Sequence, residues 1–246
     1  IVSIITVCFN SAKTIRDTIE SVINQTYQNI EYIIIDGGST DGTIDIIKEY
    51  EPYITKWVSE PDKGIYDAMN KGIGMATGDL IGILNSDDWY SNDAIELVLR
   101  VWVNHPEADI FHADVVMVNA ASKKPIKRIT CSKDIIPQPI MFVKHDVYRN
   151  MGKFDTRFKI AADTDFMRRV MPYIKKAYIN QVLYFMRDAG ISNTQYYLAG
   201  KELFIIRKRC GMNIMLNLII ALRECYGPYF RLFLEKIGLK RVVYYY

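Results

Sequence analysis

The chain has 246 residues, half of them apolar and about a quarter charged, a globular composition that excludes a disordered chain. This length suits one α/β domain of roughly 200 residues with an extension better than two small domains. The net charge of +3 is uneven, because residues 201–246 carry nine Lys/Arg against three Glu, a surplus of +6, while the first 200 residues are about −3.

The first half of the chain alternates two kinds of pattern. Short β-branched runs that end in turn residues predict strands over 1–10, 30–36, 54–60 and 79–85. Apolar residues at helical spacing between and after them predict helices over 13–25, 44–50, 64–78 and 92–104. Strands that alternate with helices predict a parallel sheet with helices on both faces.

The second half is less regular. A strand is predicted over 109–119, and the polar, proline-bearing segment 120–140 is predicted to hold a hairpin or a loop. Helices over 145–152 and 161–171 and a strand over 177–188 follow. Short helical pieces are expected between Thr194 and Leu239.

Cysteine and histidine spacing bears on redox state and metals. The four cysteines form no CxxC pair, and the three histidines lack zinc-site spacing. Reduced thiols in a cytoplasmic protein are therefore expected, with oxygen ligands for any metal. No signal peptide is visible at Ile1, and no apolar run reaches the ~20 residues of a spanning helix, so neither export nor a membrane span is expected.

Polar segments follow each of the first four predicted strands, at 6–10, 36–43, 60–64 and 85–89. In an open parallel sheet ligands bind beyond the carboxyl ends of the strands, so these segments are expected at one edge. Three of them contain Asp, which suits a divalent cation that carries an anionic ligand. A turn plus a helix cap is the competing interpretation for 36–43. That segment lacks GxGxxG spacing, which disfavours a dinucleotide site.

Three longer segments together resemble a known family. They read "VSIITVCFNSAKTIRDTIESVINQTYQNIEYIIIDGGSTDGT", "PDKGIYDAMNKGIGMATGDLIGILNSDDWY" and "GKFDTRFKIAADTDFMRRV". In their order and spacing they are similar to family 2 glycosyltransferases over residues 1–195. The resemblance implies the α/β fold called GT-A, a Rossmann-like, mostly parallel sheet flanked by helices. It divides the chain into a nucleotide-sugar half (1–105), an acceptor half (106–195) and a helical C-terminal extension (196–246).

The resemblance implies a binding site for a nucleotide sugar, with a UDP-sugar as the expected donor. Thr6 matches the strand end that lines the nucleotide pocket, and Phe9 matches an aromatic residue near the base. Asp36 matches the acid that hydrogen-bonds the base, although Gly37 stands where a second Asp is common in the family. Asn70 matches a donor-facing helix position, for which a solvated helix face is the competing interpretation.

Residues 85–87, Asn-Ser-Asp, match the DxD motif of that family. The resemblance makes Asp87 the ligand of Mg²⁺ or Mn²⁺, a cation that neutralises the departing diphosphate. Asn85 replaces the first Asp, and its amide still suits a hydrogen bond to the donor, as does Ser86. Asp88 is expected either to support the motif or to cap the helix that starts near Asn92.

Asp163 matches the catalytic Asp of the family's "ED" motif, with Ala162 in place of the Glu. The resemblance implies that Asp163 is the general base of an inverting transfer and takes the proton of the acceptor hydroxyl. A helix cap is the competing interpretation. Asp165, His112 and Gln138 are weaker candidates for support or acceptor contact, since a lone His is more often structural.

The composition of the basic, aromatic C-terminal tail indicates a binding partner. It interleaves Lys/Arg with Leu, Ile, Phe and Tyr, as in helices that lie on an anionic membrane surface. Packing on the catalytic domain or a homo-oligomer contact is the competing interpretation. Nucleic acid is disfavoured, because no nucleic-acid-binding module accompanies the charge.

Together these features predict a metal-dependent, inverting glycosyltransferase of polysaccharide or glycolipid assembly. Its partners would be a nucleotide-sugar donor and a glycan or lipid-linked glycan acceptor. The expected location is the cytoplasm, with peripheral contact at the inner face of the membrane. A sugar nucleotidyltransferase and a non-catalytic nucleotide-sugar binding module remain as alternatives.

Overall fold

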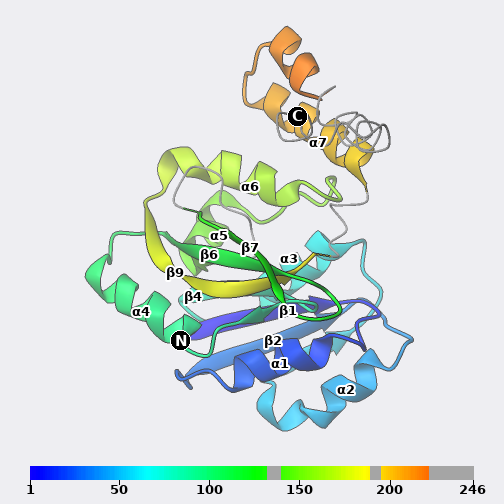
Figure 1. Ribbon diagram of the computed structural model, residues 1–246. Coiled ribbons are helices and arrows are strands. Elements are labelled where there is room, and N and C mark those ends of the chain that lie inside the picture. The colour runs from blue at the N-terminus through cyan, green and yellow to red at the C-terminus, as the bar shows by residue number, and fades with distance from the viewer. Residues whose placement is uncertain (132–139, 189–194, 222–246) are drawn as a thin grey trace.

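Figure 1 shows a computed structural model that describes residues 1–131, 140–188 and 195–221. Within these residues nine strands form one sheet in the order β3-β2-β1-β4-β8-β6-β9-β5, with β7 paired to β6. All seven residues of β1 (Val2–Cys8) are buried. Because successive side chains of a strand point to opposite faces, both faces of the sheet are covered at its centre.

The first half is the parallel βα repeat that the alternation predicts. Where its four strands pair with one another, they are parallel. In chain order its elements are β1 (Val2–Cys8), α1 (Ile15–Ile23), β2 (Ile30–Asp36), α2 (Thr43–Glu49), the 3₁₀ turn η1 (Glu51–Tyr53), β3 (Lys56–Ser59), α3 (Ile65–Met75) and β4 (Leu80–Asn85).

The register of these strands places their carboxyl ends at the same edge of the sheet. Cys8 pairs with Asp36, and Asp36 pairs with Ser59. On the other side of β1, Val7 pairs with Asn85. The four polar segments that follow these strands therefore start at one edge of the sheet, as predicted.

The second half mixes strand directions. Strand β8 is antiparallel to β4 and β6, β5 is antiparallel to β9, and β6 is parallel to β9. Its elements are β5 (Trp89–Tyr90), α4 (Ala94–Asn104), β6 (Ile110–Val118), β7 (Pro125–Ile129), β8 (Met141–Lys144), α5 (His145–Met151), α6 (Ala162–Val170), η3 (Met171–Tyr173), β9 (Lys176–Arg187) and α7 (Tyr196–Arg209).

The strands β5 and β8 are not predicted from the sequence, and of the two alternatives for the segment 120–140 the structure shows one. Strands β5 and β8 are too short for a periodic pattern to be visible. In the segment 120–140 the hairpin alternative is correct, because β7 pairs with β6 in antiparallel fashion.

An aromatic cluster positions α6 against the parallel half of the sheet. Phe154 lies 5.5 Å from Tyr66 of α3 and 5.3 Å from Phe166 of α6, measured between ring centroids. Tyr148 of α5 stacks on Phe166 at 5.1 Å. These contacts fix the helix that carries Asp163 beside the start of α3.

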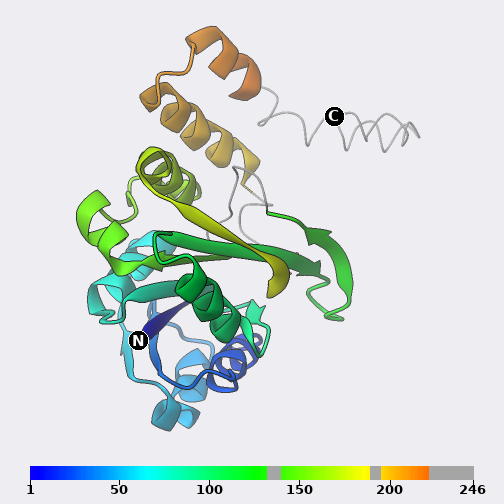
Figure 2. The same ribbon diagram turned by 90° about the vertical axis from the view of Figure 1, so that its left-hand side faces the viewer.

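The C-terminal extension continues from α6. Figure 2 shows α7 lying beyond α6, followed by a further helical stretch at 214–221. None of the helices in the described residues has the length and apolar character needed to cross a membrane.

Candidate functional site

The loops after β1 and β2 are joined by hydrogen bonds. The backbone N–H of Asn10 donates to Ser39 Oγ at 2.7 Å, and that of Thr40 donates to Asn10 Oδ1 at 2.9 Å. The backbone of Asn10 is left-handed, with φ of 50°, a conformation that Asn tolerates better than most residues. At the turn into this loop the ring of Phe9 is 62% exposed, so one aromatic face is available to a planar ligand.

Asp36 is fully buried and already bonded. Its carboxylate accepts from the backbone N–H groups of Gly38 (3.0 Å) and Ser39 (2.9 Å), and from the side chains of Ser59, Ser39 and Cys8. Burial opposes the charged form, yet these hydrogen bonds hold the pKa of Asp36 below its usual value. In this arrangement Asp36 shapes its own loop, and a contact with a base would have to displace one of these donors.

Asp62 is a carboxylate at this edge that the sequence argument did not single out. A Cβ placed on Gly37 would lie 2.5 Å from Asp62 Oδ2 and 3.4 Å from Phe9 Cδ2. Asp62 therefore fills the space next to Gly37 and beside the exposed ring. Its other oxygen accepts the backbone N–H of Gly64 at 2.8 Å. The Asp in the segment 60–64 was the only sequence signal for it.

The segment 85–87 opens from β4 at the same edge. Ser86 Oγ lies 2.8 Å from Ser11 Oγ, which ties it to the loop after β1. Asn85 Oδ1 is buried and has no hydrogen-bond partner in the described residues. The half-buried Asp87 side chain receives no hydrogen bond or ion pair from another described residue. Burial raises the pKa of Asp87. A hydrogen bond from its own backbone N–H and the positive charge of Arg187 offset part of this rise.

Asp88 has the opposite environment. Its buried carboxylate accepts from the hydroxyl of Tyr184 at 2.6 Å and from the backbone N–H of Arg187 at 3.0 Å. Burial, and then the charge of Asp87, raise the pKa of Asp88 to about 7. The capping alternative is wrong, because α4 begins at Ala94 with Asp93 before it. Asp88 instead joins this loop to β9.

The donor set fits a divalent cation held mainly by substrate. In the described residues no three His, Cys, Asp or Glu side chains cluster as a complete metal site. Asp87 offers an unpartnered carboxylate, and Asn85 offers an orphaned buried amide oxygen. Mg²⁺ is commonly bound by one or two carboxylates together with substrate phosphates and water. These two residues would therefore hold the ion only together with a diphosphate.

Arg187 lies beneath this loop. It is buried, and its guanidinium hydrogen-bonds the carbonyl oxygen of Asp87 and the carboxylate of Asp17. It also stacks on Trp89 at 4.8 Å from the ring centroid. Arg187 thus supports the loop from below and supplies a positive charge near Asp87.

Asp163 lies in the first turn of α6. Its Oδ1 accepts from the backbone N–H of Thr164 at 2.7 Å, and the hydroxyl of Tyr66 lies 3.2 Å away. Burial raises the pKa of Asp163, and these hydrogen bonds offset the rise only in part. A carboxylate with a raised pKa, held in place at the start of a helix, can take a proton.

The start of α6 meets the same edge of the sheet as Asp87. Tyr66, the neighbour of Asp163, is in the first turn of α3, which follows the carboxyl end of β3. Lys159, just before α6, donates to the carbonyl oxygen of Lys63 at 2.7 Å. The fold therefore brings Asp163, Asp62 and Asp87 to one edge, although they are far apart in sequence.

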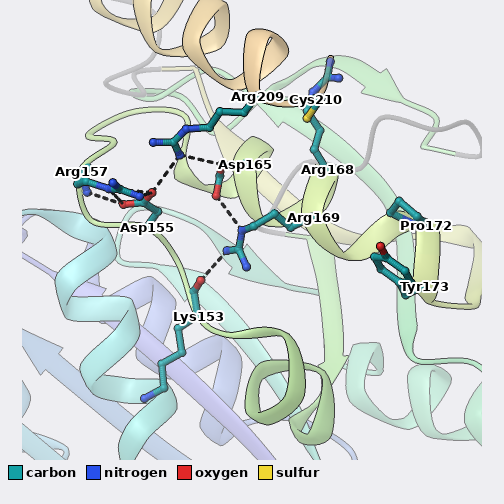
Figure 3. A pocket seen from close by; sticks show the side chains of 10 residues that line it. All are labelled: Lys153, Asp155, Arg157, Asp165, Arg168, Arg169, Pro172, Tyr173, Arg209 and Cys210. Carbon is teal, nitrogen blue, oxygen red and sulfur yellow. Dashed lines mark hydrogen bonds and ion pairs between the residues drawn. The ribbon is translucent and has the colours of Figure 1, made fainter. Parts of the chain in front are cut away.

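Asp165 points to the other side of α6. It lines a pocket of about 620 Å³ between α6 and α7. There Asp165 pairs with Arg169 at 2.9 Å and with Arg209 at 3.6 Å, and Figure 3 shows these side chains turned towards one another. The residues that line this pocket include neither Asp163 nor Asp87. Residues two apart on a helix face different directions, which separates Asp165 from the edge with Asp163.

The remaining residues predicted for the site lie in different surroundings. Thr6 is buried beside the hydroxyl of Tyr32, at 3.0 Å. Asn70 uses both ends of its amide on the backbone of Phe154, at 2.8 and 3.0 Å. His112 is buried against Tyr178, and burial lowers its pKa to about 4. Gln138 lies outside the described residues.

Comparison with known proteins agrees with this fold. The Staphylococcus aureus TarS 1–349 structure in complex with UDP-GlcNAc matches with a TM-score of 0.70 at 15% identity, over 92% of this chain and 72% of that one. A mannosyltransferase from Pyrobaculum calidifontis, solved with GDP-Man and Mn²⁺, matches with a TM-score of 0.64 at 18% identity, over 92% of this chain and 69% of that one. At these identities the likeness concerns the fold.

Sequence relatives are closer. An uncharacterized glycosyltransferase of Mycobacterium tuberculosis is 32% identical over 78% of this chain and 77% of its own. A PGL/p-HBAD biosynthesis glycosyltransferase of Mycobacterium bovis is 29% identical over 89% of this chain and 88% of its own.

The curled mixed sheet with carboxylates at the ends of its parallel strands is that of a glycosyltransferase with the GT-A fold. The chain belongs to glycosyl transferase family 2, whose family model matches residues 3–171.

Proposed function

We propose that the protein is a metal-dependent, inverting glycosyltransferase that moves a sugar from a UDP-sugar to a hydroxyl group of a glycan or lipid-linked glycan. The Asp87 side chain carries this proposal. It is half-buried at the ligand edge of the sheet and receives no hydrogen bond or ion pair from another described residue. A carboxylate removed from water without a partner is unfavourable, and a shared divalent cation relieves that cost.

The protein groups supply the remaining chemistry. A bound Mg²⁺ or Mn²⁺ would stabilise the negative charge of the leaving nucleoside diphosphate. Asp163 accepts the proton of the acceptor hydroxyl as its oxygen forms the new bond to the anomeric carbon, on the face opposite the diphosphate. The backbone N–H of Thr164 orients the Asp163 carboxylate through its hydrogen bond, and the Tyr66 hydroxyl lies 3.2 Å from the same oxygen. No covalent intermediate on the protein is needed for inversion.

The base end of the donor site rests on Phe9 and Asp62. A base that stacks on the exposed Phe9 ring would present its edge to the Asp62 carboxylate beside Gly37. A carboxylate accepts hydrogen bonds only, so Asp62 suits a base edge that presents an N–H group, as the ring N–H of uracil does.

The test is a screen of nucleotide sugars. The purified protein is incubated with UDP-glucose, UDP-galactose, UDP-GlcNAc or GDP-mannose, with Mn²⁺ or with EDTA, and release of UDP or GDP is measured. We expect the protein to release UDP from one of the UDP-sugars. This release should require Mn²⁺ and should be abolished by Asp163→Asn. ¹H NMR of the first-formed sugar should show the inverted anomer. Release of GDP alone would contradict a UDP-sugar donor. A product sugar with the retained anomeric configuration would contradict an inverting mechanism.

The same protein preparation separates the alternatives. A sugar nucleotidyltransferase would release pyrophosphate from UTP and a sugar 1-phosphate. A non-catalytic module would bind UDP with Mn²⁺ in calorimetry and release nothing from any donor. Either outcome would replace the transferase proposal.

We also propose that the C-terminal extension contacts an anionic membrane at the cytoplasmic face, which suits a lipid-linked acceptor. The side chains of the helical stretch 214–221 include five large apolar residues that are 48–66% exposed: Ile214, Met215, Leu216, Leu218 and Ile219. Lys208 and Arg209, both exposed, end the preceding helix. Exposed apolar groups beside cations are typical of surfaces that bind anionic lipid.

Vesicle sedimentation tests this contact with the full chain. Vesicles that contain phosphatidylglycerol should carry down the wild type, and Met215→Ser with Ile219→Ser should weaken that binding. Ile126→Ser is a matched control, since Ile126 is also exposed, at 55%, but lies on β7. Equal binding of the double variant and the control would overturn the membrane contact.

A further inference from the structure

Glu202 of the C-terminal extension is bonded to the segment just before α6. Its carboxylate accepts three backbone N–H groups, those of Lys159 (2.7 Å), Ile160 (2.9 Å) and Ala161 (2.9 Å). The Glu202 side chain is 5% exposed. A buried carboxylate that accepts several charge-assisted hydrogen bonds holds its partners firmly. The segment 159–161 is therefore fixed by a residue from α7.

This carboxylate takes the place of a missing local cap. Ala161 precedes α6 and has no side chain that could cap it. The first N–H groups of a helix need acceptors, and a negative charge at a helix N-terminus is favourable. Glu202 accepts the N–H of Ala161, the residue directly before α6, and places its negative charge at the start of the turn that carries Asp163.

One peptide unit connects Glu202 to the neighbour of Asp163. The N–H of Ala161 points to Glu202, and the carbonyl oxygen of the same peptide, that of Ile160, accepts the hydroxyl of Tyr66 at 2.6 Å. The Tyr66 hydroxyl is only 3.2 Å from Asp163 Oδ1. Tyr66 has one proton to donate, and the shorter distance assigns it to Ile160.

The rest of α7 supports the same docking. Ile206, one turn after Glu202, is buried in the main core. Arg209, at the end of this face, pairs with Asp155 at 3.2 Å and with Asp165 at 3.6 Å, as Figure 3 shows. Residues 202, 206 and 209 are spaced by four and three positions, so they share one face of the helix.

We propose that Glu202 is a positioning residue for catalysis: it polarises the peptide between Ile160 and Ala161, holds the Tyr66 proton on that peptide, and so leaves Asp163 oriented and free to take a proton. This inference rests on the proposed role of Asp163 as the base. It assigns the C-terminal extension a part in the chemistry, in addition to any contact with membrane.

The physical reason is hydrogen-bond cooperativity. A carboxylate on the N–H of a peptide increases the negative charge on its carbonyl oxygen, which strengthens the bond that this oxygen accepts. Without that charge the Tyr66 hydroxyl would turn towards Asp163, where a stronger hydrogen bond would favour the charged carboxylate and weaken it as a base. The ion pairs of Asp165 with Arg169 and Arg209 form a separate cluster on the opposite side of α6.

The first experiment does not need activity. Glu202→Gln keeps the size of the side chain but turns an NH₂ group towards the backbone donors. Amide hydrogen exchange followed by mass spectrometry should then be about 10-fold faster over 159–166 than in the wild type. Lys201→Gln, an exposed neighbour on α7, and Glu107→Gln, an exposed acid elsewhere, should exchange like the wild type. Unchanged exchange in Glu202→Gln would overturn the cap.

The second experiment tests the link to Asp163. With the UDP-sugar that the wild type hydrolyses, Glu202→Gln should lower kcat about 10-fold while KM for the donor changes less than about twofold, because misplacement affects the base and not the donor site. In a Tyr66→Phe background the same change should alter kcat less than about twofold. Glu202→Asp, which is charged but shorter, should fall between Glu202→Gln and the wild type, and it replaces Glu202→Gln if that variant does not fold.

The outcomes separate this inference from the proposed function. A wild type that turns over donor, with kcat unchanged in Glu202→Gln, keeps the transferase and overturns the positioning role. Equal losses with and without Tyr66 would also overturn it, since Glu202 would then act only on stability. A wild type that releases nothing from any donor overturns the proposed function, and the positioning role falls with it.

Discussion

The hydroxyl of Tyr184 donates a 2.6 Å hydrogen bond to Asp88. Together with the backbone N–H of Arg187 at 3.0 Å, this bond occupies both oxygens of the Asp88 carboxylate. The adjacent Asp87 receives no such donor from the described residues. Two neighbouring carboxylates therefore have different roles: Asp88 fastens the loop after β4 to β9, and Asp87 remains open to a cation.

The change Asp87→Asn tests this division. We expect it to remove metal-dependent binding of UDP, weakening the Kd by about 100-fold or more, since a neutral amide is a poor ligand for Mg²⁺ or Mn²⁺. Calorimetry with UDP, with and without Mn²⁺, measures the effect. Thermal stability in the absence of nucleotide should not fall, because the Asp87 side chain receives no hydrogen bond or ion pair from another described residue.

The matched change on the other side of the pair is Tyr184→Phe. It leaves the buried Asp88 oxygen without its donor, which costs about 1–3 kcal/mol of unfolding free energy. Urea unfolding should show that loss, while the Kd for UDP with Mn²⁺ should change much less than in Asp87→Asn. The reverse pattern, a stable variant with lost nucleotide binding, would mean that Asp88 is the metal ligand.

Periodicity predicts the parallel half of this fold well, because a βα repeat leaves a strong local signal. The strand register then brings Asp36 and Asn85 to one edge without further information. What the sequence cannot show is which of these groups is already bonded. Asp36 is saturated by its own loop and by the neighbouring strands, whereas Asp62 places one oxygen beside Gly37. Such partners depend on loop conformation, which has no periodicity.

Contacts between distant segments are likewise invisible in the sequence. Glu202 and Ile160 are 42 positions apart, and in sequence Glu202 is an ordinary acid on an amphipathic helix. The absence of a capping side chain at Ala161 is the one local sign that a cap comes from elsewhere. The division of the chain at residue 195 stays a prediction, although α7 is bonded to the catalytic half.

The change Asp163→Asn should separate binding from turnover. We expect the Kd for UDP to stay within about twofold and donor hydrolysis to fall by about 10²–10⁴-fold, the usual contribution of a general base. Burial raises the pKa of Asp163, and a base acts only when deprotonated. Activity of the wild type should therefore rise with pH through a pKa that lies above the ordinary Asp value of 3.8. Wild-type turnover in the variant would remove Asp163 as the base.

Gly37→Ala probes the carboxylate of Asp62. Its new methyl group would meet Asp62 Oδ2 at 2.5 Å, so the flexible Asp62 side chain must move. Because Asp62 is partly exposed, the expected cost to unfolding free energy is small, below about 1 kcal/mol. Affinity for UDP should fall about 10-fold, the size of one lost charged hydrogen bond. Asp62→Ala should weaken UDP equally, and adding Gly37→Ala to it should change little. Additive losses would show that Gly37 acts on the base by another route.

Glu31 makes acid stability a test of the sheet that carries the site. Its carboxylate accepts from Ser3 Oγ (2.6 Å), from the backbone N–H of Thr77 (2.7 Å) and from Lys56 Nζ (2.8 Å). Burial opposes the charge, but these donors lower the pKa of Glu31 from 4.5 to about 2. A lowered carboxyl pKa contributes stability above the unfolded value of 4.5, here about 3 kcal/mol, and that stability is lost as pH falls towards 2.

Urea unfolding of Glu31→Gln should thus show a deficit in unfolding free energy near pH 7 that closes between pH 5 and 2. Glu49→Gln is the control, because the exposed pair of Glu49 with Arg16 is worth less than about 1 kcal/mol. A deficit that stays constant with pH would mean that the Glu31 side chain stabilises the sheet by packing and not by its charge.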